Sequence, residues 1–241
     1  TYHWSGKHQR VVKGINLQRL LWTEGVALIP CDFRVYDAPF GGKTKNEHFL
    51  EMLKKAKEGG FEPEYVLMDS WYSSLKNLKF IARQGWLFLT RLKSNRLVNP
   101  DGKGNVPISC VEIPPEGRVV PLRGFGWVKV FQKVSRDGGL EHWATNDLQM
   151  TEEKRAELEK QGWGIEVYHR GLKQCSGAER AQVRKATAIL KHLLLCLRAF
   201  LRLEAYRLRT GVSWYEAKLS IIRDAIRSYL AHPTYALPST A

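Results

Sequence analysis

A strand–helix–strand pattern between residues 65 and 90 constrains the fold more than any other feature of the sequence. Residues 65–68 form a short, continuously apolar run, which is typical of a buried central strand. A helix is expected next, because Ser73 or Ser74 can cap it and its apolar residues recur at helical spacing. Residues 86–90 form a second buried strand. Two strands joined through a helix are expected to pair in parallel, which predicts an α/β protein.

Asp69 follows the first of these strands directly and therefore lies at the carboxyl end of a parallel strand. Ligand sites of open α/β sheets gather at such ends. An Asp at a strand end is more often a cap or a turn former than a metal ligand. A second carboxylate farther along the chain, at Glu166, favours the metal-binding interpretation.

The start of the chain predicts an antiparallel hairpin made of residues 10–22 and 26–36. Pro30 falls inside its second strand and indicates an edge position or a bulge. Asn46 is expected to cap the next helix, which a Gly-Gly pair at residues 59–60 ends.

Turn residues and short β-type runs become frequent after Ser94, so residues 95–147 are expected to form a β-rich insertion. A helix capped by Thr151 follows and ends near Gly162. We therefore predict four parts: a first core part (1–94), the insertion (95–147), a second core part that bears the Glu166 helix (148–210), and a C-terminal helix with a tail (211–241).

Residues 163–174 are expected to form a helix with Glu166, Arg170 and Lys173 on one face, at i, i+4 and i+7. A carboxylate on a rigid element beside two cations suits a divalent metal next to a phosphodiester. The alternative is a surface helix with one ordinary Glu–Arg pair, since charged helical faces are usually just solvated. Ile165 and Leu172 form a separate i, i+7 pair that is expected to hold this helix on a core.

The C-terminal sequence predicts basic helices, with 13 Lys and Arg against 5 Asp and Glu between residues 163 and 241. Arg184, Lys191 and Arg198 recur every seven residues and predict a DNA-binding face, with simple solvation as the alternative. A leucine stripe on another face is expected to be the core side: Leu190, Leu193, Leu194, Leu197 and Leu201. Gly211 separates these residues from a last helix at residues 214–230.

The composition indicates a globular protein with a polyanionic partner. Hydrophobic residues make up 44% of the chain, and 38 Lys and Arg face 24 Asp and Glu, for a net charge of +14. Nucleic acid is the simplest partner for such a charge, ahead of anionic lipid, for which the sequence offers no amphipathic terminal anchor. Four widely spaced cysteines fit neither a zinc site nor a disulfide framework and point to a reducing cytoplasm. His3 and His8 lack a third zinc ligand.

Three stretches together resemble the DDE transposases of bacterial insertion sequences, whose catalytic core is RNase H-like. They are residues 66–72, residues 89–96 and residues 163–174, the last with Glu166 and Lys173 at the Glu-x6-Lys spacing of that family. Residues 2–14 and 29–34 look like its first strands.

This resemblance implies an RNase H-like mixed sheet with flanking helices, interrupted by the β-rich insertion and followed by C-terminal helices. Asp69 would be the second catalytic acid and Glu166 the third, and the two would bind Mg²⁺, with Mn²⁺ as an alternative. Arg170 and Lys173 would contact DNA phosphates at the transposon end. The implied activity is metal-dependent cleavage and strand transfer at transposon ends, by a homodimer on DNA in the bacterial cytoplasm, at the nucleoid.

Two departures from the family pattern leave alternatives open. Part of the family has a Tyr and an Arg where this chain has Glu159 and Gly162, so the route of DNA processing, by a hairpin or otherwise, stays open. The first catalytic acid of the family is expected upstream of Thr1, so the sequence is predicted to be a fragment of a longer transposase. Asp32 is a poor substitute for this acid, because it fits the role of a polar residue at a strand edge better. A DNA-binding remnant and a nuclease without strand transfer are therefore the alternative functions.

Overall fold

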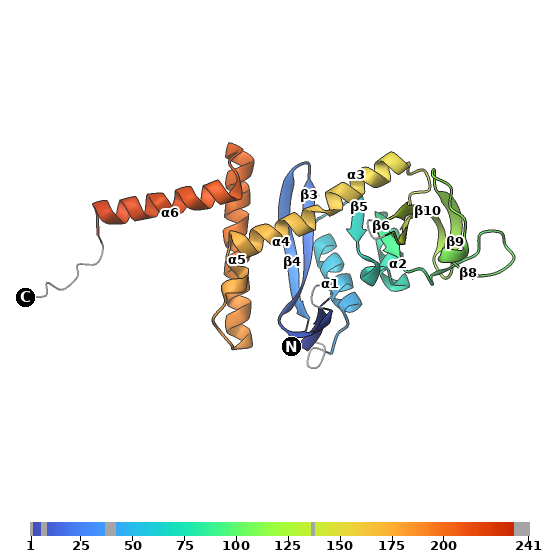
Figure 1. The fold of residues 1–241 in the computed structure, drawn as a ribbon, viewed down its shortest axis with the longest axis horizontal. Helices are drawn as coiled ribbons and strands as arrows, with labels where there is room; N and C mark the ends of the chain where they lie inside the picture. The colour runs from blue at the N-terminus through green and yellow to red at the C-terminus, as the bar shows by residue number, and fades with distance from the viewer. Residues whose placement is uncertain (1, 6–8, 37–41, 136–137, 234–241) are drawn as a thin grey trace, which may run out of the picture. The chain divides into compact units, whose positions relative to one another are not determined.

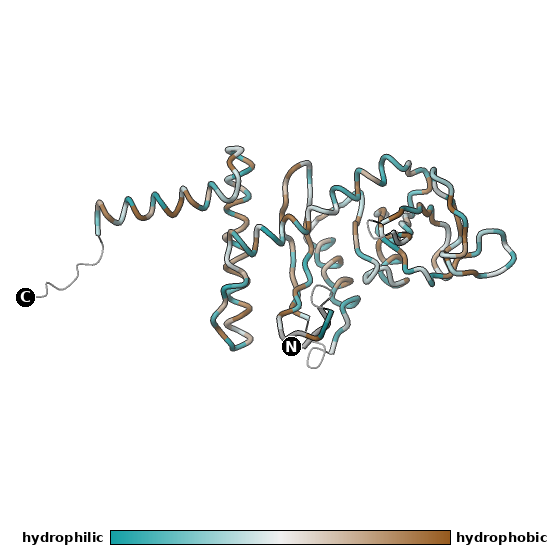
Figure 2. The backbone as a smooth tube through the Cα atoms, in the orientation of Figure 1, coloured by the Kyte–Doolittle hydropathy of each residue, from teal (hydrophilic) through white to brown (hydrophobic). Residues whose placement is uncertain are grey.

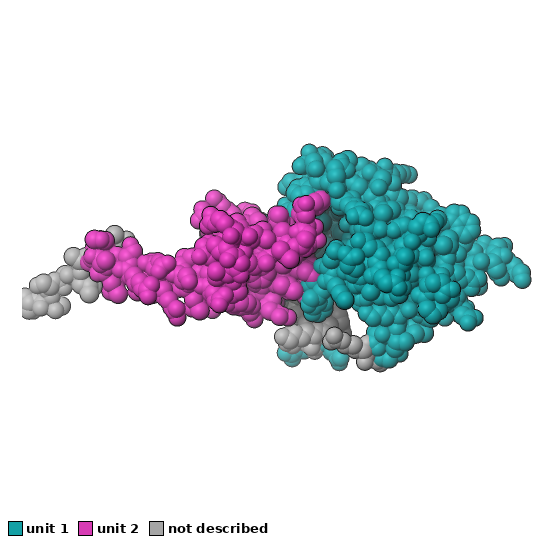
Figure 3. Space-filling view, turned by 90° about the horizontal axis from the view of Figure 1, so that it is seen from above, with its two compact units in different colours: residues 1–20, 31–163 teal, residues 21–30, 164–241 magenta. Residues whose placement is uncertain are grey.

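The computed structural model describes residues 2–5, 9–36, 42–135 and 138–233, so His8 lies outside the described residues. The chain divides into two compact units (Figure 3). Unit 1 contains Thr1–Leu20 and Cys31–Trp163, and unit 2 contains Leu21–Pro30 and Gly164–Ala241. The four-part division expected from the sequence stays a prediction.

A seven-stranded mixed sheet forms the centre of unit 1, with the strand order β5-β6-β11-β10-β9-β7-β8 (Figure 1). Only β5 and β6 are parallel, and every other neighbouring pair is antiparallel. The strands are β5 (Tyr65–Met68), β6 (Leu87–Leu92), β7 (Leu97–Val98), β8 (Val106–Pro107), β9 (Arg118–Leu122), β10 (Gly126–Val134) and β11 (Leu140–Thr145). The predicted α/β class, a mixed sheet with flanking helices, is confirmed.

The strand–helix–strand unit is present as predicted. The register of β5 and β6 pairs Met68 with Thr90. Between these strands lie the single turn η1 (Ser70–Tyr72) and helix α2 (Leu75–Arg83), and the Ser74 side chain caps α2 by accepting from the amide of Asn77. The apolar face of α2 is fully buried in the main core of unit 1, together with Phe88 and Val130.

Helix α1 (Lys45–Glu58) begins two residues earlier than the Asn46 cap predicted. Thr44 is the N-cap, in a capping box in which its hydroxyl accepts from the Glu47 amide and the Glu47 carboxylate accepts from the Thr44 amide. The prediction for Asn46 is therefore wrong. Its side chain instead donates to the backbone oxygen of Trp71, at 3.0 Å.

The first strand of the predicted hairpin is interrupted once. Residues 10–22 do not form one strand, because β2 (Arg10–Lys13) ends before Gly14 and β3 (Asn16–Glu24) begins after it. β2 pairs with β1 (Tyr2–Ser5). β3 pairs with β4 (Ala27–Tyr36) in a separate two-stranded sheet. Both strands of such a sheet are edges, which explains how β4 accommodates a proline.

Helix α3 (Glu152–Gly162) completes unit 1 and is capped by Thr151, as predicted. Its Leu158 packs in a second core cluster with Leu89 and Phe131, which come from strands β6 and β10. α3 is therefore a flanking helix of the sheet.

Unit 2 consists of helices around the tip of the β3–β4 hairpin. The helices are α4 (Gly164–Gln174), the short turn η3 (Ala178–Arg180), α5 (Ala186–Thr210) and α6 (Trp214–Ala231). Phe200 lies at the centre of the core of unit 2, where its ring meets the rings of Tyr168 and Trp214 edge-on, each with centroids 4.9 Å apart. None of the described helices is both long and apolar enough to cross a membrane.

The predicted leucine stripe of α5 is partly wrong. Leu190, Leu194 and Leu201 are 40%, 49% and 38% exposed. The buried residues of α5 are instead Leu193, Cys196, Phe200, Leu203 and Glu204. The positions of the first four follow a 3-4-3 spacing, which keeps them on one side of a helix. Leu193 is buried and Leu197 packs against the core, as predicted, but the five leucines cover a wider arc than the core contacts and so include exposed positions.

Candidate functional site

Asp69 lies at the end of β5 and caps the turn η1. Its Oδ1 accepts from the Ser70 amide at 2.5 Å, so the cap role considered for a strand-end Asp is present. The same oxygen is 3.1 Å from Nη2 of Arg91, and the Asp69 side chain is 47% exposed. The carboxylate is therefore fixed in direction and still open to a ligand.

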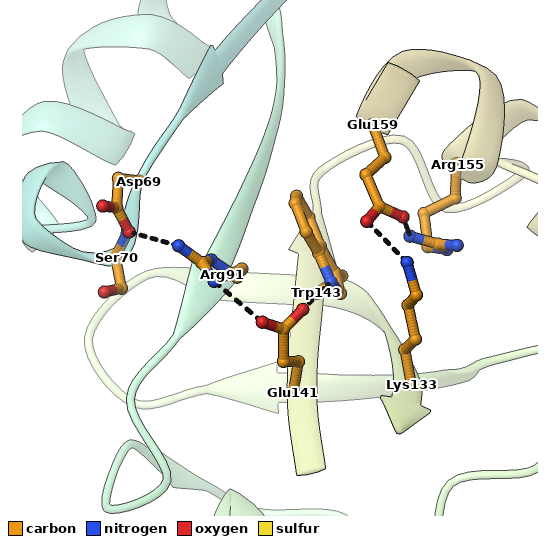
Figure 4. A network of polar contacts seen from close by, with 8 residues as sticks. All are labelled: Asp69, Ser70, Arg91, Lys133, Glu141, Trp143, Arg155 and Glu159. Atoms are coloured by element: carbon orange, nitrogen blue, oxygen red, sulfur yellow. Dashed lines mark hydrogen bonds and ion pairs between the residues drawn. The ribbon is translucent and has the colours of Figure 1, made fainter. Parts of the chain in front are cut away.

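Arg91 holds this carboxylate from the neighbouring strand (Figure 4). Its Nη1 donates to Oε1 of Glu141 on β11 at 2.8 Å, while Nη2 reaches Asp69. Burial alone would lower the pKa of Arg91, but the hydrogen bond to Glu141 and the charges of both carboxylates raise it overall. Arg91 is thus a permanent cation between two carboxylates.

Figure 4 shows that these contacts continue across the sheet to α3. The guanidinium groups of Arg91 and Arg155 lie over the ring of Trp143, 5.8 and 5.7 Å from its centroid. Arg155 is buried and donates to Glu159 at 2.7 Å, and Glu159 also pairs with Lys133 at 2.6 Å. Burial would raise the pKa of Glu159, but its bonds to Lys133 and Arg155 lower it overall. Glu159, which departs from the family pattern, thus links the sheet to α3.

A hollow of about 320 Å³ opens beside Asp69. Its lining combines acidic, basic and aromatic groups: Asp69, Ser70, Trp71, Arg91, Leu92, Leu140, Glu141 and His142. Burial lowers the pKa of His142, so this imidazole is neutral at pH 7. The hollow is a polar concave surface at the carboxyl end of β5, where the sequence predicted a ligand site.

Glu166 lies in the first turn of α4, on the solvent side of that helix. Its side chain is 54% exposed, and its Oε2 is 3.7 Å from Nδ1 of His169. Lys173 pairs with Glu179 at 2.7 Å, and Arg170 is exposed. The predicted charged face is therefore present, with His169 beside the carboxylate.

The opposite side of α4 fixes the helix to unit 2. Tyr168 and Leu172 are fully buried, and Ile165 packs against the same core, as expected. At Gly171 the backbone comes so close to Trp214 and Phe200 that a Cβ atom would lie 2.7 to 2.9 Å from their rings. Gly171 thus allows the helix that carries Glu166 to pack on α5 and α6.

The predicted site residues are divided between the two units. Asp69 belongs to unit 1, and Glu166, Arg170 and Lys173 belong to unit 2. The approach of the Asp69 and Glu166 carboxylates to within about 10 Å, close enough to share two metal ions, stays a prediction. Each unit therefore contains one of the two predicted acids, with its carboxylate about half exposed.

The three basic residues of the predicted seven-residue repeat are all exposed. Lys191 and Arg198 lie on α5, and Arg184 precedes that helix. By contrast, the Asp32 side chain is only 10% exposed and pairs with Arg34 at 2.6 Å. These contacts favour the strand-edge role over a catalytic one for Asp32.

The two predicted acids carry the kind of ligand atom that a divalent metal ion binds. Mg²⁺ takes carboxylate and water oxygens, and both Asp69 and Glu166 offer half-exposed carboxylates. Among the described residues no three His, Cys, Asp or Glu side chains are grouped to hold a metal ion. The chemistry of each carboxylate, taken by itself, therefore fits an oxygen ligand of Mg²⁺.

Sequence reasoning gave no role to Arg91, Glu141 or Trp71. Arg91 lies within residues 89–96, one of the stretches that resemble the family, but its partner Glu141 is 50 residues away and carries no local signal. Trp71 is two residues from Asp69, and an exposed Trp is visible only in the folded chain.

Comparison with known proteins identifies the family to which this chain belongs. The family model described as the transposase DDE domain matches residues 4–202, well over half of the chain. Among solved structures, the chain is similar to a piggyBac transposase in a cryo-EM structure of its synaptic complex with hairpin DNA, at 12% identity and a TM-score of 0.47. That match covers 94% of this chain and 56% of the piggyBac chain. No curated protein matches the sequence.

Proposed function

Because this chain belongs to the transposase DDE domain family, we propose that it cuts DNA at transposon ends and joins the cut end to target DNA. The observation that carries this proposal is the Asp69 carboxylate, half exposed at the carboxyl end of β5 and next to a polar hollow. Asp69 and Glu166 are the proposed catalytic acids. With DNA as its substrate, the protein would act at the bacterial nucleoid.

The proposed reaction consists of two in-line displacements at phosphorus. Water first attacks the phosphodiester at the transposon end and releases a 3′-hydroxyl, and that hydroxyl then attacks a phosphodiester of the target. Bound to Asp69 and Glu166, Mg²⁺ or Mn²⁺ would activate the attacking oxygen and neutralise the leaving one. Arg91, which already spans two carboxylates, is placed to donate to a phosphate oxygen once Asp69 has a metal as its partner.

A third carboxylate is part of the proposal. β5 is the end strand of the sheet, and among the described residues only its β6 side is paired. A strand that paired with its outer edge would bring the first acid of the family next to Asp69. With only Asp69 and Glu166, residues 1–241 are expected to bind DNA without cutting it, because two carboxylates hold two hydrated cations poorly.

End-labelled DNA that carries the terminal repeats flanking the gene tests the proposal. The chain, the product of the intact reading frame and its Glu166→Gln variant are incubated with this DNA in Mg²⁺ or Mn²⁺. We expect cleavage and joined products from the intact product alone, and DNA binding by all three. Cleavage without joining would favour a nuclease, and binding without any cleavage by the intact product would favour a DNA-binding remnant.

The basic face of α5 is proposed to bind the DNA backbone, together with Arg170 and Lys173 of α4. Each neutralised phosphate is expected to contribute about −0.9 to the slope of log K against log salt. Charge reversal of Arg184, Lys191 and Arg198 should therefore flatten the slope by about 2 to 3. The control reverses Lys54, Lys79 and Arg83, which are exposed on unit 1 and change the net charge equally. Equal losses from both variants would contradict a specific DNA-binding face.

We also propose that the protein acts as a homodimer and that α6 is the surface where two copies meet. Figure 1 shows α6 extending away from α5, and Figure 2 shows apolar positions recurring along it. Leu219, Ile222, Ile226 and Tyr229 have the 3-4-3 spacing of a coiled-coil seam and are 44% to 53% exposed.

The charges of α6 disfavour a parallel pair, because Lys218 would then face Arg223 of the other copy, with like charges. Light scattering should therefore find a dimer that Ile222→Glu dissociates. Ile221→Glu is the matched control, because Ile221 is 56% exposed on another face of the same helix. A monomeric parent protein, or equal effects of both variants, would refute this interface.

A further inference from the structure

Trp71 presents a large aromatic ring to solvent two residues after the proposed catalytic Asp69. It is 62% exposed, in the turn η1, and lines the hollow beside Asp69. Two ammonium groups lie over its ring: Nζ of Lys93 at 5.0 Å and Nζ of Lys45 at 5.5 Å from the centroid. The three residues come from α1, from η1 and from the residue that follows β6, so the folded chain assembles this cluster.

The backbone under the ring is held firmly. The Trp71 oxygen accepts from Asn46, and the Asn46 oxygen accepts from Nδ2 of Asn77 at 2.8 Å. Asn77 is 1% exposed and also donates to the backbone oxygen of Tyr72 at 2.9 Å. The Tyr72 ring is stacked on Phe49, with centroids 4.8 Å apart. The turn is therefore anchored in the core of unit 1 while the Trp71 ring points to solvent.

The two lysines lack a counter-charge at this position. Within the described part of the chain neither Lys45 nor Lys93 makes an ion pair, although both lie within 5.5 Å of the same ring centroid. Without such a partner, each ammonium group can pair with an anion beside the ring, such as a phosphate oxygen. The cluster thus combines a flat apolar face with an anion site, which is the chemistry of one nucleotide: a base to stack and a phosphate to pair.

We propose that Trp71, Lys45 and Lys93 form a subsite for an unpaired nucleotide next to the phosphodiester handled at Asp69. In a duplex the faces of a base are covered by its neighbours, so only a terminal or flipped-out base can stack on Trp71. The subsite deepens the proposed function, since it requires the DNA to be locally unpaired where it is cut.

Binding without catalysis tests the subsite. A duplex with one unpaired thymine beside the terminal-repeat junction is compared with the fully paired duplex, by fluorescence anisotropy in EDTA. Trp71→Ala should weaken binding of the unpaired DNA by roughly 5- to 150-fold and leave the paired duplex unchanged. Trp71→Phe should retain most of the affinity, because a phenyl ring still stacks. Trp127→Ala is the matched control, as Trp127 is 60% exposed on β10 of the same unit.

A second readout reports stacking directly. 2-Aminopurine at the unpaired position should be quenched on binding to the parent protein and to Trp127→Ala, and not on binding to Trp71→Ala. Equal losses on both duplexes, or quenching that survives Trp71→Ala, would overturn the subsite. Neither experiment measures DNA cleavage, so the result for the subsite is independent of the result for the proposed function. The protein could bind the unpaired base without cutting DNA, or cut DNA without binding that base.

Discussion

Replacing Gly171 with Ala puts a methyl group into the contact that positions the Glu166 helix. The new Cβ would lie 2.7 and 2.8 Å from Cζ3 and Cε3 of Trp214 and 2.9 Å from Cε2 of Phe200. These rings are 7% and 0% exposed, so neither can turn into solvent to make room. Overpacking of this kind costs about 1–3 kcal/mol, and three contacts below 3.0 Å place Gly171→Ala near the upper end.

Alanine is also the better helix former, by about 1 kcal/mol, and this gain offsets part of the cost. The net loss is therefore about 1–2 kcal/mol, or roughly 5- to 30-fold in the folding equilibrium of unit 2. Urea unfolding followed by circular dichroism gives the global value, and hydrogen exchange of the α4 and α5 amides shows where the loss occurs. Faster exchange is expected in both helices, because Gly171 lies on α4 and Phe200 on α5.

Gly162→Ala is the control for helix propensity without overpacking. A Cβ at Gly162 would meet only Leu67 Cδ1, at an ordinary 3.7 Å, and Gly162 is also helical. This variant should be as stable as the parent protein or slightly more stable. The reasoning is refuted if Gly171→Ala proves as stable as Gly162→Ala, since the close packing of α4 would then cost nothing.

Three further variants probe the polar interior and the site. Glu204→Gln should destabilise unit 2 by about 3 kcal/mol in urea melts, because Arg207 loses the carboxylate that it pairs with at 2.7 Å. Asp224→Asn is the control and should change the stability little, because the Asp224 side chain is 72% exposed. Burial lowers the pKa of His142, so this imidazole takes up a proton at higher pH in the unfolded chain than in the folded one. Unit 1 should therefore lose stability as pH falls below about 6.5. His142→Gln should flatten that dependence in urea melts between pH 5 and 8, and an unchanged slope would exclude His142 as its source. Arg91→Met should tighten Mn²⁺ binding without DNA, measured by electron paramagnetic resonance, because a cation leaves Asp69; unchanged binding would argue against a metal at this carboxylate.

Local features of the sequence were enough to predict most elements. The apolar strand before Asp69, the caps at Ser74 and Thr151, and the Glu166 helix all depend on residues within one or two turns of each other. The Thr44 cap was also readable, because Thr44 and Glu47 have the Thr-x-x-Glu spacing of a capping box. The family followed from short motifs in the same way.

The tertiary structure decided which of these residues act together. Arg91 meets Glu141 only because β6 pairs with β11 in a register that sets Arg91 against Trp143. Glu204 lies in a helix with many cations and would be assigned to solvent, yet it is 2% exposed and accepts from the amide of Leu28. Partners of this kind are 50 and 176 residues apart, so no local pattern encodes them.

The physical reason lies in the range of the interactions. Helix periodicity, capping and turn formation are set by neighbours along the chain, and a sequence displays them directly. Which face is buried, and which charge finds a partner, depends on packing against distant segments. The sequence therefore determined the elements and the candidate acids, and the fold alone decided that Asp69 has an arginine beside it and an exposed tryptophan flanked by two lysines.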